Sequence, residues 1–276
     1  PKGFAALEGD VNTLEHLEFV DQNPIGKSSR SNPVTYVKAF DEIRSLLADT
    51  SHAKARGLKP SHFSFNISGG RCETCEGEGY VTVGMQFMAD LKLVCEDCGG
   101  KRFQDHVLEV TSQGKNVHDI LSMTVDDALL FFAPEEGRKP SATIRRLLAK
   151  LQPLQDVGLG YVALGQGSNT LSGGEAQRIK LAAFLARGDR QGHTLFVFDE
   201  PTTGLHVHDV AKLLESFDAL LQQGHSVVVI EHHLDVLKCA DHILDLGPGG
   251  GKHGGLLVHQ GTPESLAQHV NSLTGK

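Results

Sequence analysis

Four cysteines constrain the fold of this chain more than any other feature of its sequence. They form two pairs, Cys72 with Cys75 and Cys95 with Cys98, with two residues inside each pair and nineteen between the pairs. Each C-x2-C turn directs two thiolates at one centre, and four thiolates close a tetrahedral zinc site that has no open position for water. We therefore predict a structural Zn²⁺ in a small module at about 69–104.

The residues between the two cysteine pairs are typical of a β-hairpin. Segments 80–87 and 91–94 alternate between apolar and polar residues or run apolar, which suits two strands held by the metal. Arg71, Lys101 and Arg102 flank the module, so this hairpin is a candidate contact for nucleic acid. The alternative is a purely structural brace.

A basic segment precedes the module, although the chain as a whole is acidic. The formal net charge is −8, yet positions 27 to 71 hold eight basic residues against three acidic ones. A local positive excess is what binding to a phosphate backbone requires, and a solvated surface with acidic partners is the alternative. The candidate DNA contacts are Arg30, Lys54, Arg56, Lys59, Arg71, Lys101 and Arg102.

The size and composition are those of a globular protein with two structural units. A chain of 276 residues lies near the limit of ~250–300 residues at which single cores stop growing. No apolar run approaches the ~18–20 residues of a membrane span, and the N-terminus lacks the layout of a signal peptide. We expect a cytoplasmic protein without a membrane partner.

The sequence Leu171-Ser172-Gly173-Gly174-Glu175 predicts the start of a helix. Ser172 and Glu175 have the spacing of a capping box, and apolar residues follow at helical intervals. Bare backbone N–H groups at the positive end of a helix form a ready site for phosphate. An ordinary capped helix with a glycine-rich entry is the alternative. The start of this helix is expected to be exposed.

Three apolar segments, at 194–198, 226–230 and 242–246, predict the strands of a parallel sheet. A segment with helical periodicity separates the first two. Strand, helix and strand at this spacing indicate an α/β fold, with the carboxyl ends of the strands at one edge of the sheet.

The ends of these strands carry residues suited to a nucleotide site. Asp199 and Glu200 follow the first strand, where open α/β folds bind their ligands. Asp199 is suited to holding Mg²⁺ through its water shell, and Glu200 to polarising an attacking water. His232 follows the second strand and is a candidate contact for a γ-phosphate; a histidine without a catalytic role is the alternative.

A P-loop is missing from the sequence. The segment Gly26-Lys27-Ser28-Ser29 resembles the end of one, but the pattern requires a glycine at position 21, which is Asp. No other position fits G-x-x-x-x-G-K-[ST]. The chain alone is therefore expected to bind ATP poorly.

Taken in order, these motifs resemble those of ABC-type ATPases. The glycine-rich helix start resembles the signature motif, the strand ending in Asp199-Glu200 resembles Walker B, and Glu231-His232 resembles the H-loop. Further segments resemble the C-terminal half of the UvrA family, the DNA-damage sensors of bacterial nucleotide excision repair. These segments are 21–26, 30–36, 70–98 and 244–248.

The resemblance implies specific roles. Gln22 would be the Q-loop residue that senses Mg²⁺ and the γ-phosphate, Glu200 the catalytic base, and His232 a γ-phosphate contact. The signature residues Leu171, Ser172, Gly173, Gly174 and Glu175 would complete the nucleotide site of another ATPase half in a head-to-tail pairing.

The resemblance also implies a domain plan. An α/β ABC-ATPase core would comprise 1–26 and 187–276 without its P-loop, and a mainly helical signature domain at 27–186 would carry the zinc module. The cofactors would be ATP, Mg²⁺ and Zn²⁺, and the partners damaged double-stranded DNA, a second copy and a UvrB-like helicase. The alternatives are a UvrA-like paralogue in resistance to DNA-binding drugs, an ABC transporter ATPase subunit, and a non-catalytic zinc-braced DNA-binding module.

Overall fold

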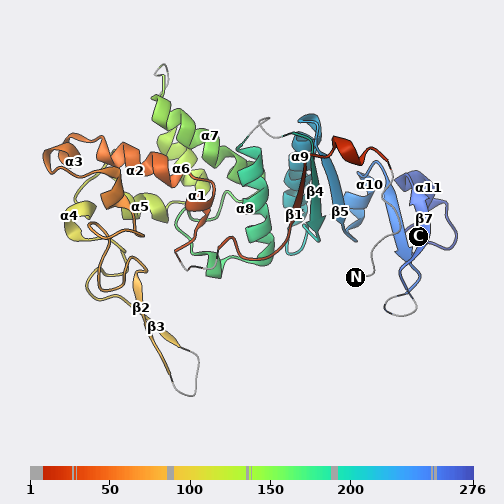
Figure 1. The fold of residues 1–276 in the computed structure, drawn as a ribbon, viewed down its shortest axis with the longest axis horizontal. Coiled ribbons are helices and arrows are strands. Elements are labelled where there is room, and N and C mark those ends of the chain that lie inside the picture. The colour runs from red at the N-terminus through yellow and green to blue at the C-terminus, as the bar shows by residue number, and fades with distance from the viewer. Residues whose placement is uncertain are drawn as a thin grey trace. The chain divides into compact units, whose positions relative to one another are not determined.

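The chain folds into two compact units. The computed structural model describes residues 9–276 except positions 27, 29, 86–89, 135, 136, 138, 188–191, 250, 252 and 253. The first unit combines the chain up to Val20 with Gly192–Lys276, and the second is Asp21–Gln191 (Figure 1). The assignment of an ABC core and a signature domain, with boundaries near 26 and 187, stays a prediction. Lys27 and Phe87 lie outside the described residues.

The first unit contains a parallel sheet of three described strands. Its order is β1 (His16–Val20), β4 (Thr194–Asp199) and β5 (Ser226–Ile230), with β4 in the centre. Helix α9 (Val207–Gln222) connects β4 to β5 and packs against the sheet (Figure 1). This arrangement confirms the predicted α/β fold with a parallel sheet.

The two faces of this sheet differ in burial. Phe196 and Phe198 of β4 are 2% and 1% exposed, and the Phe198 ring lies 4.8 Å from the ring of Phe217 in α9. Parallel sheets are normally buried on both faces, but four apolar side chains of the opposite face, which lie on the outer strands β1 and β5, are at least 48% exposed in this chain. These side chains are Leu17, Phe19, Val228 and Ile230.

The predicted third parallel strand is wrong in its pairing. The apolar segment forms β6 (Ile243–Gly247), which pairs antiparallel with β7 (Leu256–Gly261) in a separate sheet. A short return of the chain permits antiparallel pairing, whereas a parallel pair needs a longer crossover. The remaining elements of this unit are η1 (Val11–Thr13), α10 (Leu234–Lys238) and α11 (Pro263–Ala267).

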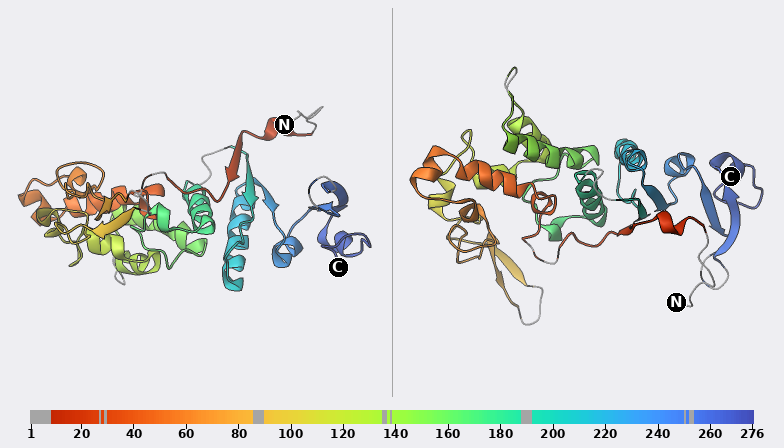
Figure 2. Two further views of the ribbon diagram at one scale, coloured as in Figure 1. Left: turned by 90° about the horizontal axis from the view of Figure 1, so that it is seen from below. Right: turned by 45° about the horizontal axis from the view of Figure 1, so that its top comes forward.

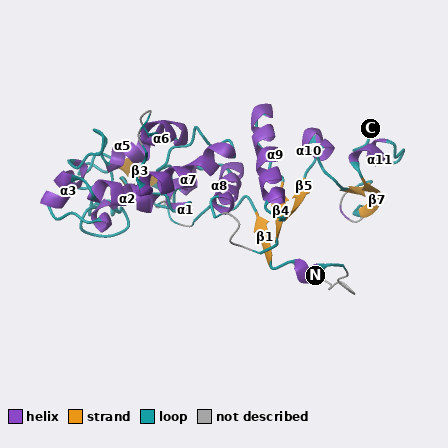
Figure 3. Cartoon of the chain, turned by 90° about the horizontal axis from the view of Figure 1, so that it is seen from above, coloured by secondary structure: helices purple, strands orange, loops and turns teal. Residues whose placement is uncertain are grey.

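The second unit is mainly helical, as Figure 3 shows. Its one described hairpin, β2 (Tyr80–Val83) with β3 (Leu91–Val94), is antiparallel and projects from the helices (Figure 2). The helical elements are α1 (Pro33–Tyr36), α2 (Phe40–Ala48), α3 (Ser51–Ala55), η2 (Pro60–Phe63), α4 (Asp105–Leu108), α5 (Val117–Ser122), α6 (Val125–Phe132), α7 (Ala142–Asp156), η3 (Ser168–Thr170) and α8 (Gly173–Leu185).

The mostly apolar sequence of Val107–Val110 predicts a strand, but Val107 and Leu108 lie in helix α4 and the next two residues follow it. Val107 and Val110 are both fully buried. Residues three apart share one face of a helix, whereas in a strand they point to opposite faces. A turn after α4 buries Val110 as well, and its N–H donates to the carbonyl of Val107 at 3.2 Å.

Helices α2 and α7 are joined by a buried carboxylate. Glu42 is 8% exposed, and its oxygens accept hydrogen bonds from Arg146 Nε at 3.1 Å and Lys150 Nζ at 3.0 Å. Burial raises the pKa of Glu42, but the hydrogen bonds from Arg146 and Lys150 outweigh it, so the pKa lies below its ordinary value. Lys150 also donates to the carbonyl of Lys38. Lys38 has a left-handed φ of 59°, which interrupts the helical backbone between α1 and α2. The apolar spacing from Val34 to Leu47 predicts one amphipathic helix, but the structure has two in this region, α1 and α2.

Among the described helices, none combines the length and the apolar character needed to cross a membrane.

Candidate functional site

The four paired cysteines meet in the second unit. All are buried, and their sulfur atoms lie within 4.8 Å of one another, with Cys72 Sγ 3.9 Å from Cys95 Sγ and Cys75 Sγ 3.7 Å from Cys98 Sγ. Tetrahedral zinc with Zn–S bonds of about 2.3 Å holds its sulfurs about 3.8 Å apart. The spacing therefore fits Zn²⁺ bound by four thiolates, as the sequence predicts.

The environment of the cluster controls when the thiols ionise. Burial raises the pKa of Cys98 to about 12. Because zinc binds the thiolate, metal binding must displace the proton that the Cys98 thiol would otherwise keep at neutral pH. The N–H of Gly79 donates to Cys75 Sγ at 3.2 Å and stabilises negative charge on that sulfur.

Backbone hydrogen bonds close the base of the cysteine module. The N–H of Cys72 donates to the carbonyl of Arg102 at 2.9 Å, and the N–H of Gln104 donates to the carbonyl of Gly70 at 2.9 Å. The Phe103 side chain beside this closure is 1% exposed and packs edge-on against Phe65, with ring centroids 6.3 Å apart. The module is therefore anchored to the helices at both of its ends.

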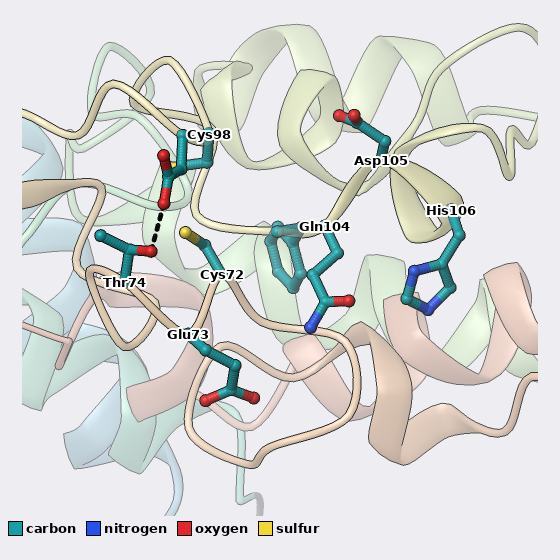
Figure 4. Close-up of a pocket in the computed structure, with 9 residues that line it drawn as sticks. Cys72, Glu73, Thr74, Cys98, Gln104, Asp105 and His106 are labelled. Atoms are coloured by element: carbon teal, nitrogen blue, oxygen red, sulfur yellow. Dashed lines mark hydrogen bonds between the residues drawn. The ribbon is translucent and has the colours of Figure 1, made fainter.

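A pocket of about 450 Å³ lies beside the cysteine cluster (Figure 4). Thr74 on the first cysteine turn donates a hydrogen bond to Asp97 on the second, which links the two turns across the pocket. Three carboxylates, those of Glu73, Asp97 and Asp105, line this pocket and disfavour contact with phosphates there. The pocket face of the module is therefore a poor candidate for contact with DNA.

Most of the predicted DNA contacts are engaged within the chain. Arg30 pairs with Glu78, Lys54 with Asp49, Arg56 with Glu109 and Arg71 with Glu73. Arg102 donates to the carbonyl of Gly165 at 3.2 Å and lies over the ring of Phe65. Lys59 and Lys101 are exposed. DNA binding by these residues stays a prediction.

The predicted capping box forms at the start of α8. Ser172 Oγ accepts the N–H of Glu175 at 3.2 Å, and Glu175 Oε2 accepts the N–H of Ser172 at 2.7 Å. The expected exposure holds for Ser172, but Gly173 is half-buried and Gly174 is buried. The phosphate-binding role of Leu171 to Glu175 stays a prediction.

Tyr161 belongs to this helix start, although no sequence motif indicates it. Its hydroxyl donates to Glu175 Oε1 at 2.7 Å. Burial, followed by the hydrogen bond to Glu175, raises the pKa of Tyr161. Burial also raises the pKa of Glu175, but hydrogen bonds from Ser172 and Tyr161 outweigh it, so the pKa is lowered overall. Glu175 therefore remains ionised and fixes both groups.

Gln22 packs against the first residue of α8. A methyl group added at Gly173 would lie 2.9 Å from Gln22 Oε1 and 3.0 Å from Gln22 Cβ, so any larger residue there would displace the Gln22 side chain. The preceding residue, Asp21, is held by Lys180 of the same helix. The proposed Q-loop residue and the proposed signature motif thus contact each other within one unit, and the nucleotide-sensing role of Gln22 stays a prediction.

Asp199 and Glu200 lie at the carboxyl edge of the parallel sheet, where the sequence predicts them. Asp199 is in register with Ile230, and both acidic residues are exposed. Glu200 has a φ of 44°, a left-handed conformation that costs a non-glycine residue on the order of 1–3 kcal/mol. Its N–H donates to the carbonyl of Ile230 at 2.9 Å, so β5 holds this strained residue in place.

Glu231 connects the ends of β4 and β5, and sequence reasoning assigns it no role of its own. Its Oε1 accepts the N–H of Thr202 at 2.9 Å and also the Thr202 hydroxyl. Its Oε2 accepts the N–H groups of His232 at 2.8 Å and His233 at 3.0 Å. The His232 side chain is exposed. Because β4 and β5 are neighbouring parallel strands, the three predicted strand-end residues Asp199, Glu200 and His232 lie at one edge of the sheet.

A parallel sheet with acidic strand ends and a helical unit with a buried four-cysteine cluster define an α/β protein that contains a candidate metal-binding module. The "UvrABC system protein A" of Aquifex aeolicus is 54% identical over 274 residues, and that of Clostridium perfringens 50% identical over 276 residues. These matches cover 97% and 100% of this chain. The chain belongs to the UvrA family and spans 28% of the length of these relatives.

The fold agrees with this assignment. The crystal structure of UvrA2 from Deinococcus radiodurans superimposes with a TM-score of 0.87 at 47% identity, over 98% of this chain and 32% of that protein. No family model matches the chain.

Proposed function

We propose that the complete protein recognises damaged DNA in nucleotide excision repair and hydrolyses ATP as an ABC-type ATPase. The observation that carries the proposal is the gathering of Asp199, Glu200 and His232 at one sheet edge in a chain of the UvrA family. In this proposal Asp199 holds Mg²⁺ through water, Glu200 takes a proton from the attacking water, and His232 contacts the γ-phosphate.

The helix start at Ser172 would serve a second ATPase half. Its two glycines carry no side chains of their own, and their backbone N–H groups lie at the positive end of α8. In this proposal the signature motif contacts the nucleotide held by that other half. The P-loop lysine would come from a part of the longer protein outside this chain. A second copy and a UvrB-like helicase are the proposed partners.

Zinc would act as a structural brace and not as a catalyst. Bound by Cys72, Cys75, Cys95 and Cys98, it would fill its coordination shell with sulfur and hold the base of the β2–β3 hairpin. Lys59 and Lys101 are the exposed cations best placed by charge to contact phosphates, because the other candidates have partners within the chain.

Filter binding of the full-length protein to UV-damaged and intact duplex tests the DNA half of the proposal. We expect a preference for damaged duplex and a loss of affinity with salt, with a log–log slope of roughly −0.9 per phosphate contact. Absence of any DNA affinity at low salt would contradict it.

ATP turnover by the full-length protein tests the other half. Glu200→Gln should abolish turnover while ATP binding is retained, because the amide keeps the shape of the side chain but cannot accept the proton. A non-catalytic DNA-binding module instead predicts that Glu200→Gln leaves the function of the protein intact. Co-purification with a membrane protein would favour a transporter subunit.

A further inference from the structure

The Glu231 carboxylate is saturated with hydrogen bonds. A carboxylate offers about four acceptor positions, and Glu231 receives four donors, two from Thr202 and one each from His232 and His233. Burial raises its pKa, but the hydrogen bonds from Thr202 and from the two histidine amides outweigh it, so the group stays ionised at neutral pH. A carboxylate so occupied has no lone pair left for a proton or a metal, so it acts through the groups that it holds.

One of these groups is the turn that follows Glu200. The left-handed Glu200 is bonded to β5 through its N–H, and its carbonyl accepts the N–H of Thr203 at 3.1 Å. Thr202, two residues after Glu200, is fixed by both of its bonds to Glu231. The strained backbone at Glu200 is thus restrained on both sides, and Glu231 provides the restraint on the far side.

The other group is the backbone of His232. The Glu231 side chain turns back onto the N–H groups of the two residues that follow it, which fixes the backbone where β5 ends. The Glu231 side chain therefore orients the backbone of Thr202, which follows Glu200 at the end of β4, and the backbone of His232 at the end of β5. Glu200 and His232 thus lie at the same edge of the sheet.

We propose that Glu231 is a positioning residue of the ATPase site, which sets Glu200 and His232 against the same nucleotide by tying the turn at Thr202 to the backbone of His232. This role rests on the proposed ATPase function. Catalytic groups misplaced by about 1 Å can lose about 10²-fold in rate, even when the substrate still binds. The expected signature of a lost restraint is therefore a fall in kcat without a matching loss of nucleotide affinity.

The test uses the full-length protein with kcat, KM for ATP and the Kd of a non-hydrolysable ATP analogue measured separately. In Glu231→Gln one carbonyl oxygen remains as an acceptor, but the amide nitrogen faces two donors. We expect kcat to fall at least ~10-fold while the Kd changes less than ~3-fold. Thr202→Val, which removes one of the four donors, should lower kcat less, and Thr202→Ser, which restores the hydroxyl, should recover it. Glu264→Gln changes an exposed glutamate of α11 and serves as the control for the chemical substitution.

A double variant separates positioning from general damage to the fold. If Glu231 acts by holding Thr202, then Glu231→Gln and Thr202→Val together lower kcat by less than the product of their separate effects, whereas independent effects would multiply. Turnover lost in Glu200→Gln but unchanged in Glu231→Gln would overturn the positioning role alone, as would a fall in kcat accompanied by an equal loss of nucleotide affinity. Turnover unchanged in Glu200→Gln would overturn the ATPase function and the positioning role together.

Discussion

Lys180 holds Asp21 by both its backbone and its side chain: the ammonium donates to the carbonyl at 3.0 Å and also to the carboxylate. Lys180 lies two turns along α8 from Gly173, which contacts Gln22. The same helix therefore grips two consecutive residues at two points, and it restrains the backbone on which the proposed Q-loop side chain is mounted.

Lys180→Met should loosen this segment without unfolding α8. Methionine keeps much of the apolar stem but removes both hydrogen bonds, so amide exchange in residues 21–26 should accelerate in the full-length protein. Hydrogen exchange followed by mass spectrometry measures it, with Lys212→Met, an exposed lysine of α9, as the control. Unchanged exchange in residues 21–26 would show that Gln22 packing alone holds the segment.

The same contact has a defined pH dependence. The hydrogen bond from Lys180 lowers the pKa of Asp21 below its ordinary 3.8. A lowered folded-state pKa stabilises the contact above the ordinary value, and that stabilisation is lost as pH falls through the lowered value. Exchange in wild type and in Lys180→Met should therefore converge in acid and differ at neutral pH.

Removal of one zinc ligand should abolish metal binding. Cys98→Ser leaves three thiolates and an open tetrahedral site, so zinc should fall from about one ion per chain to a small fraction. Elemental analysis of purified protein measures the ratio, and Cys239→Ser, which alters an exposed cysteine outside the cluster, should keep a full complement. Equal zinc in both variants would contradict the four-cysteine site.

Zinc affinity should also rise with pH. The pKa of Cys98 is raised to about 12, so protons compete with the metal throughout the neutral range. Competition with a chromophoric chelator between pH 6 and 8 measures the trend, after correction for ionisation of the chelator itself. Affinity independent of pH would mean that the thiols are already ionised without metal.

Glu42→Gln should destabilise the contact between α2 and α7. It removes the negative charge that pairs with Lys150 and Arg146; the Arg146 side chain is 57% exposed and its share is screened by solvent. We expect a loss of about 1–3 kcal/mol in local stability, chiefly from Lys150. Because the pKa of Glu42 is lowered from its ordinary 4.5, this contribution is present above that value and disappears as pH falls through the lowered one.

Hydrogen exchange at Leu47 and Leu151 reports this loss, because both residues are fully buried on the two helices concerned. Glu215→Gln, on the exposed side of α9, is the matched control. A difference between wild type and Glu42→Gln that persists unchanged in strong acid would contradict the ionic origin of the effect.

Phe19→Ser should reduce self-association of the isolated chain and lower the stability of the full-length protein. Phe19 is 56% exposed on the uncovered sheet face, so the substitution should reduce self-association of the isolated chain in sedimentation measurements. We expect the longer protein to cover this face, in which case the same change costs about 1.5–3 kcal/mol of burial. Leu130→Ser, at a 79% exposed position of α6, should change neither measurement.

The features that the sequence predicted best depend on the spacing of residues within one short segment. The cysteine cluster follows from two C-x2-C turns, and the capping box at Ser172 from a single S-x-x-E. The central strand β4 follows from an uninterrupted apolar run that is buried beneath α9. In each case one short segment supplies both the signal and most of the structure.

Features that depend on distant partners were not predictable. Glu231 owes its role to Thr202, which lies 29 residues earlier, and Tyr161 reaches Glu175 across 14 residues. The segment 107–110 was ambiguous because three apolar residues among four fit a strand as well as a helical turn. The pairing of β6 was decided by β7, which apolar content alone does not reveal.

The closed base of the cysteine module has a consequence for how this protein can vary. Because the backbone bonds between 70–72 and 102–104 fix the two points where the module joins the rest of the unit, and Arg30 pairs with Glu78 before β2 begins, the length of the β2–β3 hairpin can change without altering these contacts. Residues added to or removed from the hairpin two at a time, one on each strand, preserve its pairing register. The length of the β2–β3 hairpin can therefore change while the contacts at the base of the cysteine module stay the same.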